Sequence, residues 1–416
     1  MARSLISCAT SGVSVSTTLD YPLAHTFPGG GQATEANAQI TYRLPGTIDR
    51  MFVRITSNSA TAASTFAIRK NSGAGNLSIS IPSTSTGIFY DVVNSDAVAS
   101  GDEINVRLTP GSVNLIRVAH YGARFDATTN TAQRLAAFSS TGLAFSTNNS
   151  DAYNVPAGDL AFNGTESQTQ VEFNTAGTLK NLQINVRTNS RAQASTCRIR
   201  KNTANGNLSI SIAAAATGIL EDTTNSDSVA VDDIINYDIR NAAGGGTLTT
   251  SLMSVEFETT NNKFQFLGGT NVGLLTSTNI FWPPSGSFSG AASTDANAEQ
   301  TIDIAGTASN LWLRITSNTV SVVSEFGVRK NQADTALFIS VGASTSGTFE
   351  DTDTVTYIAT DEMNHEVNIP AGTGDLTLRG RGVLYENTEG VATPAVSGWS
   401  PLTSQPYPDQ TSVVGY

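Results

Sequence analysis

The stretch Phe66–Asn71 reads FAIRKN, and it returns as CRIRKN at Cys197–Asn202 and as FGVRKN at Phe326–Asn331. The match continues downstream, because NLSISI at Asn76–Ile81 is repeated without change at Asn207–Ile212. Residues 66 and 197 are 131 positions apart, and residues 66 and 326 are 260 apart. The chain therefore contains one module of about 130 residues three times, and each copy has the usual size of a single-core domain.

Each copy alternates apolar and polar residues over short stretches, such as Phe52–Ile55 (FVRI) and Leu182–Val186 (LQINV). A period of two places one face of a strand in a core and the other in water. Clusters of Gly, Asn, Ser and Asp separate these stretches about every 8 to 12 residues, which is typical of an antiparallel sandwich. About eight candidate strands per copy favour a jelly roll over the seven-stranded immunoglobulin type. We predict an all-β chain of three tandem jelly-roll domains, at 1–130, 131–260 and 261–388.

The last segment, residues 389–416, departs from the repeat. It holds four prolines between residues 394 and 408 and shows no strand alternation. Such a composition indicates an extended C-terminal arm, with a disordered tail as the alternative. Aromatic side chains commonly anchor protein interfaces, so we predict that Trp399 and Tyr407 bind a neighbouring subunit.

Composition restricts the partners of the chain. Only 14% of residues are charged and the net charge is -12. Phosphate binding requires concentrated Lys and Arg, so nucleic acid is not an expected partner. Neither a membrane-spanning stretch nor a signal peptide is visible, which predicts assembly inside a cell and release by a route other than secretion.

A pair of basic residues recurs at the same place in each copy, at Arg69-Lys70, Arg200-Lys201 and Arg329-Lys330. We interpret these pairs as strand ends that pair with carboxylates, and docking of a partner is the alternative.

The sequence offers little for catalysis. His25, His120 and His365 fall at different points of the repeat, so the copies do not share a histidine site. P-loop, GxSxG and HExxH motifs are absent. We predict that the chain is not an enzyme and has no cofactor, apart from a possible calcium ion.

The acidic turns are the most site-like feature of each copy. Clustered carboxylate oxygens can bind Ca²⁺. Asp and Asn are also the residues that tight turns require, and this is the alternative interpretation. The candidate calcium ligands are Asp91, Asp96, Asp102, Asp222, Asp227, Asp233, Asp351, Asp353 and Asp361.

The motif VASGDEI at Val98–Ile104 resembles the late-strand entry of jelly rolls of the C1q and tumour-necrosis-factor type. The wider pattern, IRKN followed by NLSISI, TGIFYD and VASGDEI, resembles repeats in structural proteins of tailed bacteriophages. The resemblance covers about residues 30–110, 160–240 and 290–370, although Gly101 becomes Asp232 in the second copy. It implies a virion protein, such as an outer capsid decoration or a tail or fibre component, with other virion proteins as partners.

Two arrangements of the modules stay open. One chain can form a pseudo-trimer around a local threefold axis, or the domains can be stacked end to end, and homo-oligomers are also expected. Short polar joints at 125–130 and 259–262 favour fixed domains. The alternative functions are a glycan- or receptor-binding module and a microbial cell-surface or filament protein. Tyr90, Tyr153 and Trp282 are the candidate aromatic platforms of the binding module, with packing in the core or at its rim as the alternative interpretation.

Overall fold

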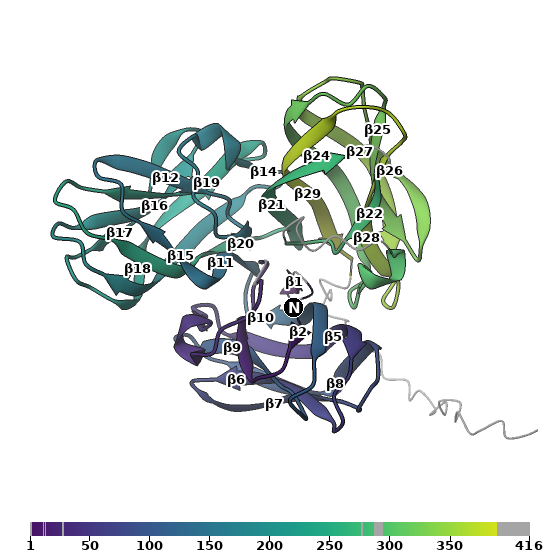
Figure 1. The fold of residues 1–416 in the computed structure, drawn as a ribbon, viewed down its shortest axis with the longest axis horizontal. Coiled ribbons are helices and arrows are strands. Elements are labelled where there is room, and N and C mark those ends of the chain that lie inside the picture. The colour runs from purple at the N-terminus through teal and green to yellow at the C-terminus, as the bar shows by residue number, and fades with distance from the viewer. Residues whose placement is uncertain are drawn as a thin grey trace, which may run out of the picture.

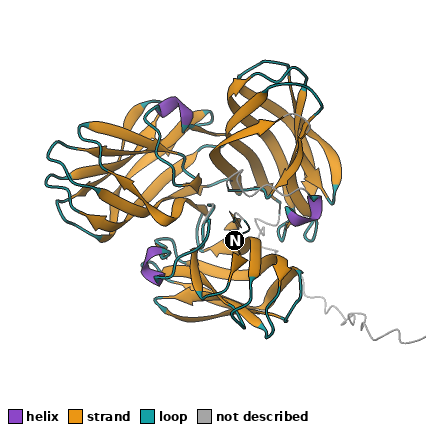
Figure 2. Cartoon of the chain, viewed as in Figure 1, coloured by secondary structure: helices purple, strands orange, loops and turns teal. Residues whose placement is uncertain are grey.

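The computed structural model describes residues 2–10, 12, 14–26, 29–275, 278–286 and 294–388. Strands dominate these residues, and the helical segments among them are single 3₁₀ turns at η1 (Glu35–Asn37), η2 (Glu166–Gln168) and η4 (Asp295–Asn297) (Figure 2). The period-two alternation of the sequence becomes an alternation of buried and exposed side chains, for example along β7 (Gly73–Ile81). The all-β prediction is confirmed.

Module 1 is a sandwich of two antiparallel sheets with the strand order of a jelly roll. Its first sheet has the order β1-β10-β5-β8, and its second has the order β3-β9-β6-β7. The short strands β2 (Ser14–Val15) and β4 (Ile40–Thr41) extend the first and second sheets through β10 and β9. The remaining bounds are β1 (Ala2–Ala9), β3 (Leu19–Pro22), β5 (Gly46–Asn58), β6 (Ser64–Lys70), β8 (Gly87–Val98), β9 (Glu103–Thr109) and β10 (Ile116–Ala127).

Module 2 repeats this order strand for strand. Its first sheet runs β11 (Thr131–Phe145), β20 (Leu248–Thr259), β15 (Gly177–Asn189), β18 (Gly218–Val229). Its second sheet runs β12 (Ser150–Asn154), β19 (Asp233–Asn241), β16 (Ser195–Lys201), β17 (Ala204–Ile212), with β14 (Val171–Phe173) beside β19.

Module 3 has the same two sheets. The first runs β21 (Lys263–Leu275), β29 (Asp375–Asn387), β24 (Gly306–Asn318), β27 (Gly347–Tyr357). The second runs β22 (Thr278–Trp282), β28 (Glu362–Ile369), β25 (Ser324–Lys330), β26 (Ala333–Val341), with β23 (Gln300–Thr301) beside β28. Three residues separate β10 from β11, and three separate β20 from β21, at the joints expected near residues 130 and 260.

The FAIRKN motif recurs because its apolar side chains enter the core of each module. Phe66 and Ile68 of β6 are fully buried, while Arg69 of the same strand is half-buried at the surface. In module 2 the small thiol of Cys197 takes the place of the phenyl ring and is equally buried. Burying a side chain of the size of Phe contributes about 1.5–3 kcal/mol, so this strand is a main contributor to each core.

The three modules lie around the N-terminal strand β1, rather than in a row (Figure 1). The two-residue strand β13 (Gly158–Asp159) pairs in parallel with β11 of its own module and with β21 of module 3. It thereby joins the first sheets of modules 2 and 3 into one nine-stranded sheet. The corresponding segment of module 1 bridges β1 through Thr26 and β11 through His25. The backbone N–H of Gly286 in module 3 donates to the carbonyl of Leu267, 3.1 Å away.

Candidate interaction sites

The hydrophobic cores are shared between modules in a cyclic order. The core of module 1 includes Phe138 and Leu252 from module 2. The core of module 2 includes Trp312 from module 3, and the core of module 3 includes Leu5 from module 1. Each core is therefore completed by its neighbour, and the third contact closes the ring.

Polar contacts between the modules follow the same cycle. Asn185 in β15 donates from Nδ2 to the carbonyl of Ala36 in η1, at 2.6 Å. The corresponding residue of module 1, Arg54 in β5, donates from Nη2 to Oδ1 of Asn297 in η4, at 3.1 Å. A central strand of one module thus contacts the 3₁₀ turn of another at two of the three interfaces. Repetition of one contact geometry is the property of a pseudo-threefold arrangement.

Buried amides fix the centre of the ring. The backbone N–H of Gln265 donates to Oε1 of Gln133 at 2.8 Å, and Nε2 of Gln133 donates to the carbonyl of Gln265 at 2.7 Å. The His25 ring lies between Gln133, at 3.2 Å from Nε2, and Ser285, at 3.1 Å from Nδ1. These four residues come from all three modules, so their hydrogen bonds specify how the modules meet.

A pair of carboxyl groups lies where modules 2 and 3 meet. Burial, and then the neighbouring Glu350, raises the pKa of Glu172 to about 7, while Arg314 acts in the opposite direction. Burial lowers the pKa of Arg314, and Glu172 partly offsets this effect. Like charges at close range disfavour ionisation, so the neighbouring Glu350 makes the Glu172 carboxyl harder to ionise.

Replacement of Glu172 by glutamine is expected to stabilise the protein at pH 8 by about 1 kcal/mol, after allowance for solvent screening. The folded pKa of Glu172 lies above its unfolded value, so the glutamate favours folding below pH 4.5 and loses that contribution as pH rises through about 7. At pH 5 the change should fall to about a quarter of its value at pH 8. Thermal unfolding at both pH values measures it, and a Glu172→Gln variant equally shifted at both would contradict the raised pKa of Glu172.

The acidic turns hold their aspartates through backbone hydrogen bonds. Asp91 accepts from the backbone N–H groups of Ser78, Val93 and Asn94, at 2.9 to 3.2 Å. Asp222 makes the corresponding contacts in module 2, and these bonds to its ionised form lower its pKa to about 2. Asp96 and Asp227 accept from backbone N–H groups of β7 and β17. Backbone hydrogen bonds of this kind are what we expect if these aspartates stabilise tight turns.

The other candidate calcium ligands are also placed by local contacts. Lys70, Lys201 and Lys330 lie 2.8 to 3.5 Å from carboxylate oxygens, and those carboxylates belong to Asp102, Asp233 and Asp361. The structure confirms that the basic pairs contact carboxylates. Asp351 accepts from the backbone N–H of Asp353 at 3.1 Å. Within the described ranges, no group of three or more His, Cys, Asp or Glu side chains could hold a metal ion.

Calcium binding remains a prediction, and a chelator tests it. With so many carboxylate oxygens already accepting backbone hydrogen bonds, we expect the melting temperature to be the same in calcium and in excess EGTA. Binding of calcium to the folded state alone would raise the melting temperature with ion concentration. A rise of several degrees in calcium would therefore restore the ligand set proposed from the sequence.

The predicted aromatic platforms differ in their surroundings. Trp282 is 1% exposed and packs in the core of module 3, so the core-packing interpretation holds for it and the surface-platform interpretation is wrong. The Tyr90 hydroxyl lies 2.6 Å from Oγ1 of Thr301, which assigns this side chain to the interface of modules 1 and 3. Tyr153 lies at the surface with the Arg200 guanidinium 6.0 Å from its ring centroid. Trp399 and Tyr407 lie outside the described residues.

The histidines are separated, as their sequence positions predict. Burial lowers the pKa of His25 and of His120 to about 3, with the Arg54 charge adding to the effect at His120. Burial and the Arg381 charge also lower the pKa of His365. All three are neutral at pH 7 and lie among interface or core residues. No helix in the described part of the chain has the length and apolarity needed to cross a membrane.

Sequence reasoning missed the residues that join the modules. Gln133, Gln265 and Trp312 lie in strands that read as ordinary half-polar or apolar strands, and no motif marks them as contacts between modules. The one available signal was divergence: at the position of Trp312, modules 1 and 2 have Phe52 and Gln183, three residues of different chemistry in otherwise similar strands.

Comparisons with known proteins give weak likenesses. No family model matches the chain, and neither does any curated protein. A structure described as the triple jelly-roll fold and turret assembly of an archaeal virus is 14% identical, with 91% of this chain and 90% of that chain covered and a TM-score of 0.19. A chain of Sulfolobus turreted icosahedral virus is 12% identical, with 82% and 80% covered and a TM-score of 0.19.

A Paenibacillus xanthan lyase is a third structural neighbour. It is 12% identical, 68% of this chain is covered, and the TM-score is 0.20. The aligned region spans only 30% of the lyase. Two viral proteins and one lyase are thus similar to the chain, and at these identities and scores none of them assigns it to a family.

Proposed function

We propose that this chain is a non-enzymatic structural protein of a virion, either an outer capsid decoration or a tail or fibre component. The observation that carries the proposal is the closed ring of three jelly rolls, each core completed by the next module. Jelly rolls are building units of viral capsids and of lectins. A ring fixed by buried contacts presents a rigid body of constant shape, which a repeating shell requires.

The chemistry of the chain supports the same proposal. His25 and Glu172, whose pKa values are both strongly shifted, lie at module interfaces and contact protein side chains. Perturbed groups at a catalytic site would instead line an open cleft. Trp399 and Tyr407 in the C-terminal arm remain the proposed anchors on a neighbouring subunit.

Immunogold electron microscopy tests the proposal. An antibody raised against the recombinant chain is applied to particles and cells from the source culture. Label over capsids or tails is the expected result, and its position distinguishes a decoration from a fibre. Label confined to cell surfaces or filaments would overturn the virion assignment in favour of a microbial surface protein.

A further inference from the structure

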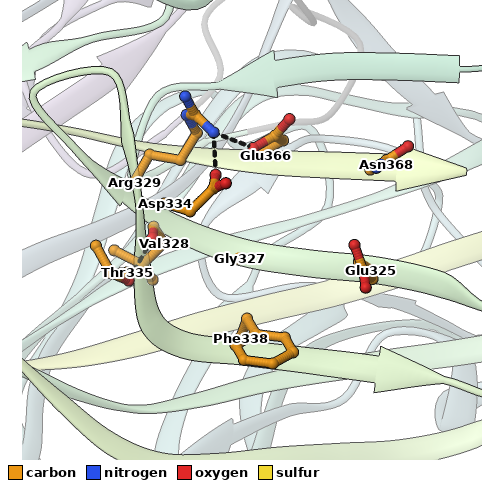
Figure 3. Close-up of a pocket in the computed structure, with 9 residues that line it drawn as sticks. All are labelled: Glu325, Gly327, Val328, Arg329, Asp334, Thr335, Phe338, Glu366 and Asn368. Carbon is orange, nitrogen blue, oxygen red and sulfur yellow. Dashed lines mark hydrogen bonds and ion pairs between the residues drawn. The ribbon is translucent and has the colours of Figure 1, made fainter.

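The second sheet of module 3 carries a pocket of about 250 Å³ on its outer face. Strands β25, β26 and β28 form it, and Gly327 lies in its floor (Figure 3). Arg329 forms ion pairs with Asp334 and Glu366 at one end (Figure 3). Glu325 and Asn368 lie toward the other end, and the Phe338 ring, 49% exposed, lies beside the floor.

Strand register shows that the other modules lack this pocket chemistry. Gly327 pairs with Phe338 on one side and with Glu366 on the other. The same three positions hold Ala67, Ser78 and Arg107 in module 1 and Arg198, Ser209 and Asp238 in module 2. Module 3 alone therefore combines a glycine floor with an aromatic ring at this place.

Arginine ion pairs occupy the same face in modules 1 and 2. Arg107 lies 2.9 Å from Asp20 and 2.8 Å from Glu35. Arg198 lies 2.6 Å from Asp238 and 3.3 Å from Asp151. In module 3, Glu366 replaces the first arginine and Gly327 the second. The loss of both long side chains opens the hollow, and Phe338 supplies an apolar surface beside it.

We propose that this pocket binds one unit of a neutral saccharide. A sugar ring has an apolar C–H face, which the exposed Phe338 ring can cover, and a rim of hydroxyl groups that both donate and accept hydrogen bonds. Glu325 supplies acceptors and Asn368 both donors and acceptors, while Arg329 is held by Asp295, Asp334 and Glu366. Apolar contact with a few convergent polar groups is the usual composition of a ligand pocket.

The charge of the pocket favours a neutral ligand over an ammonium group. Three carboxylates line it, but Arg329 already pairs with those of Asp334 and Glu366. Glu325 is left as the single carboxylate of the pocket without an ion pair among the described residues. A polyol can use this group as an acceptor without requiring charge neutralisation.

Saturation-transfer difference NMR on the full chain tests the proposal, with glucose, galactose, mannose, N-acetylglucosamine and N-acetylgalactosamine as probes. At about 10 mM sugar, the method detects millimolar dissociation constants. We expect ring protons of at least one sugar to receive saturation. The Phe338→Ser variant, which has the residue of modules 1 and 2, should weaken binding at least about tenfold.

Gly327→Arg provides a second variant, because it places the residue of module 2 in the pocket. A Cβ at Gly327 would meet the Cβ of Phe338 at 3.5 Å, an ordinary contact, so the fold should accept the change. This variant should abolish the signal while its melting curve stays within a few degrees of the wild type. Ser209→Ala, on the corresponding face of module 2, should leave the signal unchanged.

Two outcomes would overturn the saccharide assignment. One is the absence of saturation transfer to every sugar. In that case, binding of N-acetyl-lysine methylamide would identify the pocket as a cation site. The other is a sugar signal that persists in both Phe338→Ser and Gly327→Arg. Particle labelling is independent of these measurements, so failure here is distinguishable from failure of the virion assignment.

Discussion

Replacement of Trp312 by alanine is expected to lower the free energy of unfolding by about 3–5 kcal/mol, the usual cost of truncating a buried large aromatic residue. Trp312 is 1% exposed and belongs to β24 of module 3, yet its ring packs in the core cluster of module 2. A Cβ added at Gly380 would lie 3.0 Å from the ring, so the strand beside it leaves room for the indole. The loss should therefore be shared by modules 2 and 3.

Urea-induced unfolding followed by circular dichroism measures this loss. Trp312→Phe is the matched control, because it retains an apolar ring at the interface and should cost less than half as much. Limited proteolysis should also cut the alanine variant faster near residues 260–262, where the two modules join. An alanine variant within about 0.5 kcal/mol of the wild type, the range of surface substitutions, would show that Trp312 does not hold the modules together.

Acidification from pH 6.5 to pH 4 is expected to remove about 3 kcal/mol of stability for each of His25 and His120. Burial lowers the pKa of both imidazoles from 6.5 to about 3 in the folded protein. The unfolded chain therefore binds more protons than the folded chain between these values. Stability from these groups is complete above pH 6.5 and is lost as pH falls toward 3.

The measurement compares the wild type with a His25→Gln/His120→Gln variant in urea at pH 7 and pH 4. Glu172 and Glu299 have pKa values raised to about 7 and act in the opposite direction, so the difference between the proteins is more informative than either profile alone. The wild type should lose more stability than the variant. Equal losses would mean that neither histidine is buried in its neutral form.

The sequence predicted the fold well because the features that specify it are local. Alternation of apolar and polar residues marks each strand. Motifs such as NLSISI recur because their apolar side chains, including Leu77 and Ile79, enter the core. The jelly-roll class follows from strand number and turn spacing. The short joints also limited how far the modules could separate.

The contacts between modules could not be read in the same way. The Gln133–Gln265 pair joins residues far apart in the chain, and neither residue belongs to a repeated sequence motif. Trp282 is a candidate surface platform in the sequence, whereas tertiary packing buries it. The pocket at Gly327 exists because this strand lacks the long side chain that module 2 has at the same position. Only comparison of the strand registers of the three modules shows this difference.

Small-angle X-ray scattering of residues 1–388 tests most directly whether the three modules form one closed body. A compact chain of this length has a radius of gyration of about 21–22 Å. A ring with three lobes around β1 should give a value within a few ångström of this, with a single-peaked distance distribution. A much larger radius with a long tail in the distribution would indicate modules arranged end to end, and would contradict the account.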